Sequence, residues 1–310
     1  MTQAATTAKS DFSINQKDVY QQVTDTIIEQ LEKGVVPWQK PFDDNSRNRF
    51  TIPVNFTTGK RYQGINIILL WAHAIKNNYQ SDEWATFKQW NDKGERIRKG
   101  ESAKTQLIIF YDTYEKEVDG ELQKVPFAKV STVYNRCQLQ SYTTPETTAE
   151  DTNKIKPSVN KTIEIEQFII NTGAEICEIN SGAYYDITQD KIFMPYAASF
   201  KETDQCSITE NYLATLFHEL THWTGAKKRL DRLEKSRFGD QKYANEELVA
   251  EFGAAFLCSG FSLPTVEKGN HAAYIDNWLK VLREDNRAIF RAASAANKAV
   301  EYLNSLQPSF

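Results

Sequence analysis

The sequence feature that most constrains this chain is the stretch LFHELTHW at residues 216–223, which contains the pattern His-Glu-x-x-His. Residues 207–210 (SITE) have the spacing of a capping box, so we expect a helix that begins there and runs through the pattern. Positions four apart lie on one face of a helix, which puts His218 and His222 one turn apart. Two such imidazoles can hold a zinc ion, and Glu219 can take a proton from a water bound to it. The alternative is a polar helix face with two solvated histidines.

A third metal ligand is available in residues 245–257 (NEELVAEFGAAFL). Asn245 is a good N-cap and acidic residues suit a first turn, so we expect a second helix that starts at this residue. Glu247 and Glu251 are four apart and would share a face. One carboxylate would complete a two-histidine, one-glutamate set that leaves a position open for water, as in catalytic zinc sites. The other could hold a ligand histidine by its second ring nitrogen. The alternative is that both are solvated helix charges.

The composition is that of an ordinary globular protein. With 310 residues, 40% of them apolar and 25% charged, the chain is long enough for two domains. No apolar run approaches the ~20 residues that span a bilayer, and the N-terminus lacks the apolar segment of a signal peptide, so we expect no membrane contact. The four scattered cysteines form no Cys-x-x-Cys pair, which indicates the reducing cytoplasm: Cys137, Cys177, Cys206 and Cys258.

The residue pattern divides the chain into two domains of α+β class. Residues 1–12 are rich in Thr, Ala and Ser and are expected to be disordered, and residues 13–140 form the first domain. Residues 141–160 are rich in Thr, Glu, Pro and Lys with almost no apolar side chains, which predicts a linker. Residues 161–310 form the second domain, which contains the His-Glu-x-x-His helix.

Apolar periodicity and turn signals predict the elements of each domain. In the first we expect helices at 13–33 and 65–76, a helix capped by Ser81 that carries residues 84–90, and a hairpin of strands 106–114 and 125–134 around the turn Asp119-Gly120. In the second we expect a helix at 162–171, strands at 175–179, 183–187 and 191–194, and C-terminal helices at 271–282 and 285–306. The strand at 191–194 is expected to lie along the histidine helix as an edge strand that pairs with an extended peptide.

One window of the first domain combines cations with aromatic side chains. Residues 45–105 contain eleven basic and five acidic residues, together with eight aromatic ones. Single-stranded nucleic acid needs cations for its phosphates and flat faces for unstacked bases. The pattern suits such a partner, but a core with tryptophans at helical spacing and a solvated basic surface would give the same composition.

Six segments together resemble a known family: VPWQKPF at 36–42, TGKRYQGIN at 58–66, WATFKQW at 84–90, RKGE at 98–101, YLATLFHELTHWTG at 212–225 and EELVAE at 246–251. With them the chain resembles, over nearly its whole length, the ArdC-type antirestriction proteins of conjugative plasmids and the N-terminal part of TraC-type plasmid primases. The resemblance implies an N-terminal single-stranded DNA-binding domain and a C-terminal zincin-like metallopeptidase domain. It also implies a role in protecting incoming plasmid DNA from host restriction endonucleases.

The second domain also resembles ImmA/IrrE-type peptidases, whose third ligand is a glutamate within a run that ends Gly-Ala-Ala-x-Leu. Here that run ends at residues 253–257 (GAAFL), so the resemblance places the ligand at Glu247 and leaves Glu251 to hold a histidine. The family resemblance also implies DNA contacts in the first domain, for which the candidates are Trp38, Lys40, Arg47, Arg49, Lys60, Arg61, Tyr62, Lys88, Arg98 and Lys99.

We therefore expect His218, His222 and Glu247 to bind zinc, although their spacing also suits manganese or another divalent metal. Glu219 would act as general base on the metal-bound water. The donor that stabilises the oxyanion is left open among Tyr184, Tyr185, Tyr243 and His271. The expected partners are single-stranded DNA and a host restriction-system protein or another peptide. Two alternatives stay open: a metallopeptidase that cleaves a regulator or host protein with the first domain as recruitment module, and a metal that only holds the second domain together.

Overall fold

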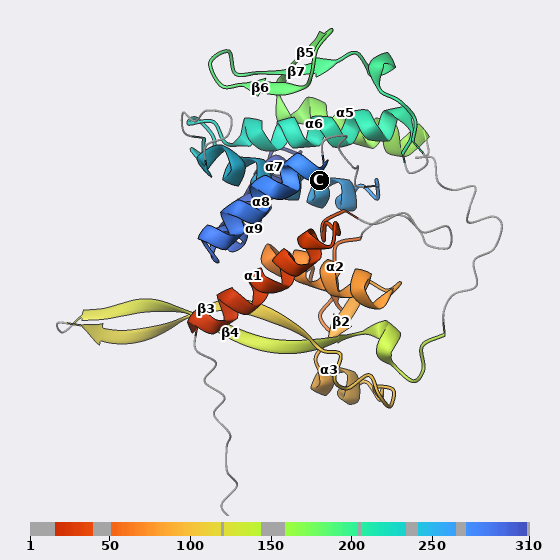
Figure 1. Cartoon of the computed structure of the whole chain (residues 1–310), viewed down its shortest axis with the longest axis vertical. Helices are drawn as coiled ribbons and strands as arrows, with labels where there is room; N and C mark the ends of the chain where they lie inside the picture. Colours follow the sequence, from red (N-terminus) through yellow and green to blue (C-terminus); the bar gives the residue numbers. More distant parts are fainter. Residues whose placement is uncertain are drawn as a thin grey trace, which may run out of the picture.

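The computed structural model describes residues 16–39, 51–118, 121–143, 159–203, 206–233, 241–264 and 271–308. They form two α+β units, as the sequence predicts, with helices packed between a long hairpin in the first unit and a small sheet at the far end of the second (Figure 1). No helix in these ranges is long and apolar enough to cross a membrane. The N-terminal segment 1–12 and most of the predicted linker 141–160 lie outside the described residues.

The first unit is built on a four-stranded sheet in the order β1-β2-β4-β3. Strand β1 (Val54–Asn55) is parallel to β2 (Glu83–Ala85), whereas β4 (Glu121–Asn135) is antiparallel to both β2 and β3 (Gln106–Val118). The hairpin strands are longer than predicted, because pairing continues to Val118 opposite Glu121. The predicted turn at residues 119–120 lies outside the described residues. Two helices of this unit lie close to their predicted bounds, α1 (Gln16–Glu32) and α2 (Ile65–Asn77), and α2 packs against β3.

The prediction of a helix from Ser81 through Trp90 is wrong in its first half. Trp84 belongs to strand β2, pairs with Asn135 of β4 and is buried. The helix α3 (Phe87–Asp92) starts only after Thr86. Thr86 and Gln89 form the capping box, with Gln89 N donating to Thr86 Oγ1 at 3.2 Å and Thr86 N donating to Gln89 Oε1 at 2.9 Å. The Thr-x-x-Gln spacing was a helix-start signal in its own right.

The second unit has a three-stranded sheet in the order β5-β7-β6, with helices on one side of it (Figure 1). Its elements, in chain order, are α5 (Val159–Thr172), β5 (Glu175–Ile179), β6 (Tyr184–Asp186), β7 (Lys191–Pro195), α6 (Ile208–Thr224), α7 (Gln241–Gly260), α8 (His271–Glu284) and α9 (Ala288–Ser305). All of them were predicted, and most boundaries differ by a few residues.

Two details of the second unit correct the sequence-based expectation. Strand β7 is the central strand, parallel to β5 and antiparallel to β6, so it is not an edge that can accept a peptide. Ile192 and Met194, two residues apart and therefore on one face of the strand, are fully buried, whereas Phe193 between them is only half-buried. Asn245 is not an N-cap: helix α7 already runs from Gln241, and the Asn245 amide donates to the Gln241 carbonyl at 2.9 Å.

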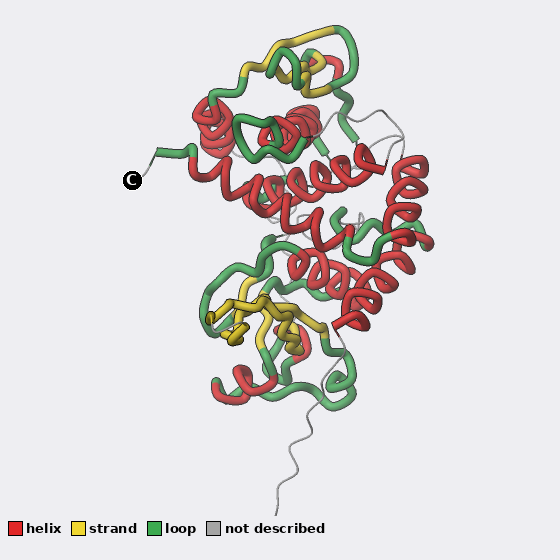
Figure 2. The backbone as a smooth tube through the Cα atoms, turned by 90° about the vertical axis from the view of Figure 1, so that its left-hand side faces the viewer, coloured by secondary structure: helices red, strands yellow, loops and turns green. Residues whose placement is uncertain are grey.

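The two units share one hydrophobic core. Helix α7 contributes Phe252 and Phe256 to a cluster that continues through the first unit, and the Trp38 ring lies 4.7 Å from that of Phe252. Trp38 also contacts Trp278 of α8 at 5.2 Å, and Trp71 of α2 lies 5.8 Å from Phe256. Figure 2 shows the helices of both units packed together between the two sheets. A second cluster lies between α6 and the small sheet.

An asparagine closes the exposed edge of the first sheet. Strand β3 is the last strand in the order, which leaves backbone groups of its outer edge without a strand partner. Asn66 of α2 takes that place at Ile109: its Nδ2 donates to the Ile109 carbonyl at 2.7 Å, and the Ile109 N–H donates to its Oδ1 at 2.8 Å. The pair is buried and fixes α2 against the strand.

We expect Asn66→Ala to lower the free energy of unfolding by about 2–4 kcal/mol, because it leaves a buried N–H and a buried carbonyl unpaired. Chemical denaturation followed by circular dichroism measures the change. Asn77→Ala is the matched control: it removes one hydrogen bond, to the His73 carbonyl near the end of the same helix, and should cost less than about 0.5 kcal/mol. Equal losses in the two variants would contradict this account of Asn66.

Candidate metal centre

The histidine pair is presented by a firmly capped helix. Ser207 and Glu210 form the predicted capping box of α6, with Ser207 N donating to Glu210 Oε2 at 2.9 Å and Glu210 N donating to Ser207 Oγ at 3.3 Å. Three turns later, His218 and His222 lie on one face, and their Nε2 atoms are 3.2 Å apart. His218 is 3% exposed, so the pair opens into the protein rather than onto a solvated helix face.

Helix α7 brings a carboxylate to the same point. Glu247 Oε2 lies 3.4 Å from His218 Nε2, and its Oε1 lies 3.4 Å from His222 Nε2. The two helices approach closely here because α7 carries Gly253, where an added Cβ would lie 2.4 Å from Thr221 Oγ1 of α6. His218, His222 and Glu247 are the group of possible metal ligands found among the described residues.

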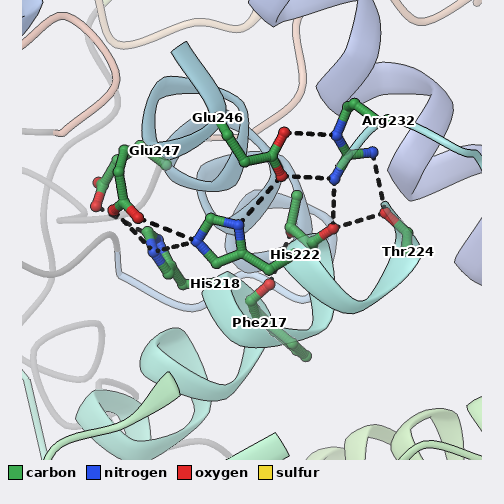
Figure 3. Close-up of polar contacts among 9 residues, drawn as sticks. Phe217, His218, His222, Thr224, Arg232, Glu246 and Glu247 are labelled. Carbon is green, nitrogen blue, oxygen red and sulfur yellow. Dashed lines mark hydrogen bonds and ion pairs between the residues drawn. The ribbon is translucent and has the colours of Figure 1, made fainter. Parts of the chain in front are cut away.

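The Nδ1 atoms of the two histidines also meet carboxylates, and Figure 3 shows the contact between His222 and Glu246. His222 Nδ1 lies 3.1 Å from Glu246 Oε1, and His218 Nδ1 lies 3.4 Å from Glu251 Oε1. Each histidine is therefore held on its Nδ1 side by a glutamate of α7, while both Nε2 atoms face Glu247. A carboxylate at Nδ1 fixes the orientation of a ligand histidine and makes its Nε2 more basic.

Arg232 holds Glu246 in place. Its Nε and Nη2 donate to the two Glu246 carboxylate oxygens at 2.8 and 2.9 Å, and Nη2 also donates to the Thr221 carbonyl at 2.7 Å. The segment after α6 folds back tightly enough to allow this, because the N–H groups of Arg232 and Leu233 both donate to the Gly225 carbonyl at 2.8 Å. Figure 3 shows this guanidinium between Glu246 and the end of α6.

The electrostatics of the centre favour positive charge. Burial disfavours the imidazolium form of His222, but hydrogen bonds with Glu246 and Glu247 outweigh burial and raise the pKa of His222 to about 10. Burial also opposes ionisation of Glu246 and Glu247, yet their contacts with the histidines, and with Arg232 for Glu246, hold the pKa of both carboxyls below its usual range. The negative charge of Glu246 and Glu247 can be balanced either by protonated imidazoles or by a metal cation bound in place of those protons.

The donor set fits a divalent metal ion. Two ligands bound to zinc at about 2.0–2.1 Å with tetrahedral angles lie about 3.3 Å from each other. The three contacts among His218 Nε2, His222 Nε2 and the Glu247 oxygens are 3.2, 3.4 and 3.4 Å. Three protein ligands leave a coordination position for water or substrate, and the nitrogen and oxygen donors suit zinc or manganese.

Other residues predicted for the site have different surroundings. Glu219 follows His218 on α6 and is 6% exposed. Among the oxyanion candidates, the Tyr185 hydroxyl donates to Asp190 at 2.6 Å and accepts from Arg229 at 2.9 Å. Tyr184 is exposed and stacks on Phe193 with ring centroids 4.9 Å apart. Tyr243 is half-buried, and the side chain of His271 lies outside the described residues.

Sequence reasoning missed the parts played by Glu246 and Arg232. The only signal for Glu246 was its place in the run EELVAE, in which three glutamates are available for two histidines. Arg232 lies in a loop 14 residues before Glu246, and no helical or strand spacing links them. Their contact becomes visible only when α6, the loop and α7 are packed together.

The proposed DNA contacts in the first unit separate into three groups. Trp38 and Tyr62 are buried, which argues against their expected contact with DNA: Trp38 packs in the shared core, and the Tyr62 hydroxyl accepts from Asn55 at 3.3 Å. Lys40, Arg47 and Arg49 lie outside the described residues. The other five are exposed: Lys60, Arg61, Lys88, Arg98 and Lys99.

Comparison with protein-family models divides the chain along the same lines as the two units. Residues 17–134 match the N-terminal domain of the anti-restriction factor ArdC. Residues 163–295 match a zincin-like metallopeptidase model, and this range contains α6 and α7 with the whole donor set.

Similar proteins cover nearly the whole chain. The protein y4eC of Sinorhizobium fredii, uncharacterised, is 34% identical over 94% of this chain and 92% of its own length. A DNA primase TraC of Escherichia coli is 33% identical over 93% of this chain, which spans only 27% of the primase. Two crystal structures of the antirestriction protein ArdC from plasmid R388 are similar to this one. The metal-free structure superposes with a TM-score of 0.74 at 37% identity, covering 93% of this chain and 97% of that chain. The Mn(II)-bound structure superposes with a TM-score of 0.73 at 35% identity, covering 94% of this chain and 99% of that chain.

Proposed function

The chain belongs to the ArdC antirestriction family, and on that premise we propose that it protects incoming plasmid DNA from host restriction by binding single-stranded DNA and by acting on a peptide at the α6–α7 metal centre. None of the four cysteines forms a disulfide, which suits a reducing compartment such as the cytoplasm. The peptide substrate that best fits an antirestriction role is a protein of the host restriction system.

The observation that carries the peptidase part is the constellation around His218 and His222. Both Nε2 atoms and the Glu247 carboxylate converge at contacts of 3.2 to 3.4 Å, and each Nδ1 is backed by a further glutamate. A purely structural site would more often use a fourth protein ligand and close the coordination sphere. We assign zinc to it from the donor set, and the Mn(II)-bound structure of ArdC from plasmid R388 supports manganese as the other candidate.

The chain's own residues supply the remaining chemistry of peptide hydrolysis. A divalent ion held by the three ligands acts as a Lewis acid that polarises a carbonyl and lowers the pKa of water. Glu219, next to ligand His218 on the same helix and almost fully buried, takes the proton of the attacking water and passes it to the leaving amine. Glu246 and Glu251 keep the two imidazoles oriented with Nε2 toward the centre.

The test is a restriction-protection assay in cells that receive unmodified DNA. We expect the wild-type chain to protect that DNA and Glu219→Gln to lose protection, while the purified variant keeps its metal content and its affinity for single-stranded DNA. Glu202→Gln, an exposed glutamate away from the centre, is the matched control and should protect like wild type. Full protection by Glu219→Gln would count against proton transfer at this residue and would leave the metal a structural role.

A further inference from the structure

The structure separates the aromatic residues of the basic window into buried and exposed ones. Between residues 51 and 105, Tyr62, Trp71, Trp84 and Trp90 are buried. Phe56 is half-buried and stacks on Trp90 with ring centroids 4.6 Å apart, and Tyr79 is half-buried with its hydroxyl donating to Glu101 at 3.1 Å. The remaining aromatic side chain in this range is Phe87, which is 60% exposed. Six of the seven rings therefore have structural roles, and one faces solvent.

Phe87 is held firmly although it is exposed. It is the first residue of α3, directly after the capping box of Thr86 and Gln89. One turn on, the buried Trp90 anchors the helix by donating from Nε1 to the Tyr134 carbonyl at 3.0 Å. The Phe87 ring makes an edge contact with the Tyr134 ring at 6.4 Å and is otherwise open. An exposed ring on a fixed backbone loses little freedom when a flat partner binds to it.

One cation adjoins Phe87 in sequence, and two more belong to a turn that is hydrogen-bonded to the same helix. Lys88 is the next residue, and the turn at residues 57–61 ends in Lys60 and Arg61, all three exposed. Asn55 joins that turn to α3: its Oδ1 accepts from the Thr57 and Thr58 N–H groups at 3.1 and 3.0 Å, and its Nδ2 donates to Gln89 Oε1 at 3.3 Å.

These three cations have no ion-pair partner within the described parts of the chain, whereas some nearby cations are engaged. Arg136 is paired with Glu83 and lies over the Phe56 ring, Lys104 is paired with Glu101, and Arg98 donates to the Cys137 carbonyl. Of the cations available for a phosphate, Lys88 adjoins Phe87 in α3, and Lys60 and Arg61 belong to the turn that Asn55 joins to α3.

We propose that Phe87 is the base-stacking residue of the chain's single-stranded DNA site and that Lys60, Arg61 and Lys88 bind the phosphates beside it. The proposal rests on the DNA-binding part of the proposed function and names the contact residues. Sequence-independent single-strand binding combines an exposed aromatic face with a cationic path for the backbone, and this surface has both. A duplex, whose bases are stacked already, offers no face to Phe87.

The experiment measures the affinity of the full-length protein for two fluorescent oligonucleotides of about 20 residues, oligothymidine and an abasic strand, by anisotropy at low salt. Wild type should bind oligothymidine more tightly than the abasic strand. Phe87→Ala should lose about 5- to 150-fold on oligothymidine and little on the abasic strand, which has no base to stack. Phe87→Trp should keep the preference for bases, and an unchanged melting temperature verifies that each variant is folded.

The cations are tested with the same two strands. Lys60→Gln, Arg61→Gln and Lys88→Gln should weaken binding of both and should each lower the slope of log affinity against log salt by about 0.7. Lys298→Gln, an exposed lysine on α9, is the matched control and should change neither quantity.

Three results would overturn the proposal. Phe87→Ala could bind oligothymidine like wild type. Phe110→Ala, which removes a 46% exposed aromatic side chain on β3, could be the variant that loses affinity for oligothymidine instead. Wild type could fail to distinguish oligothymidine from the abasic strand. Absence of all binding by wild type at low salt is a different result, because it removes the DNA-binding part of the proposed function and the Phe87 assignment together.

Discussion

Replacement of Glu247 by alanine is expected to lower the affinity of the protein for Zn²⁺ or Mn²⁺ about a thousand-fold. Two histidine nitrogens would remain, 3.2 Å apart, without the carboxylate that faces both of them. If a zinc site is worth on the order of 10–16 kcal/mol, one of three protein ligands accounts for roughly 4 kcal/mol. Isothermal titration calorimetry of the metal-depleted protein with each ion measures the loss directly.

The other glutamates of α7 make this prediction specific. Glu246→Gln and Glu251→Gln should lose only about 10- to 100-fold, because they act on the ligands through the Nδ1 atoms rather than on the ion. Asn245→Ala, on the same helix with its amide bonded to the Gln241 carbonyl, should bind like wild type. If Glu251→Gln lost more affinity than Glu247→Ala, the two glutamates would have been assigned in the wrong order.

Arg232→Ala is expected to lower the free energy of unfolding by about 1–3 kcal/mol, since Glu246 loses its charge-assisted hydrogen bonds with the guanidinium and keeps only its contact with His222 among the described charged residues. Glu246 would lose both guanidinium hydrogen bonds, and the Thr221 carbonyl near the end of α6 would lose one donor and keep the Thr224 hydroxyl. Denaturant titration of the metal-depleted protein measures the change without a contribution from metal binding.

A second variant separates the effect of the Glu246 charge from that of lost packing. Arg232→Ala combined with Glu246→Gln removes both charges, so it should be more stable than Arg232→Ala alone although it carries one more substitution. If the double variant were less stable than Arg232→Ala by the full cost of Glu246→Gln, the two residues would act independently. The pairing would then contribute little.

Local patterns predicted the elements that present the donor set. The capping box at Ser207 and Glu210 fixed the start of α6, and the four-residue spacing put His218 and His222 on one face. These features depend on neighbours in sequence, and helix geometry is the same in any fold. The start of α7 was misplaced because Asn245 has the chemistry of a cap but lies inside a helix that starts four residues earlier.

Features that depend on packing could not be predicted in this way. Composition cannot tell whether an aromatic ring is free to stack on DNA or fills a core. Trp38 is buried and Phe87 is exposed, although both lie in segments that combine aromatic and basic residues. The apolar run of β7 is compatible with an edge strand or a central one, and only its pairing with both β5 and β6 decides between them.

The core that α7 shares with α1, α2 and α8 limits how genes for such proteins can recombine. Each half would expose a large apolar face without the other, since Trp38 and Trp71 are covered by Phe252, Phe256 and Trp278. The halves therefore cannot be exchanged freely between proteins, even though separate family models match them. Recombination should move the pair intact, and the primase TraC, which aligns with 93% of this chain within a much longer sequence, has such an intact pair.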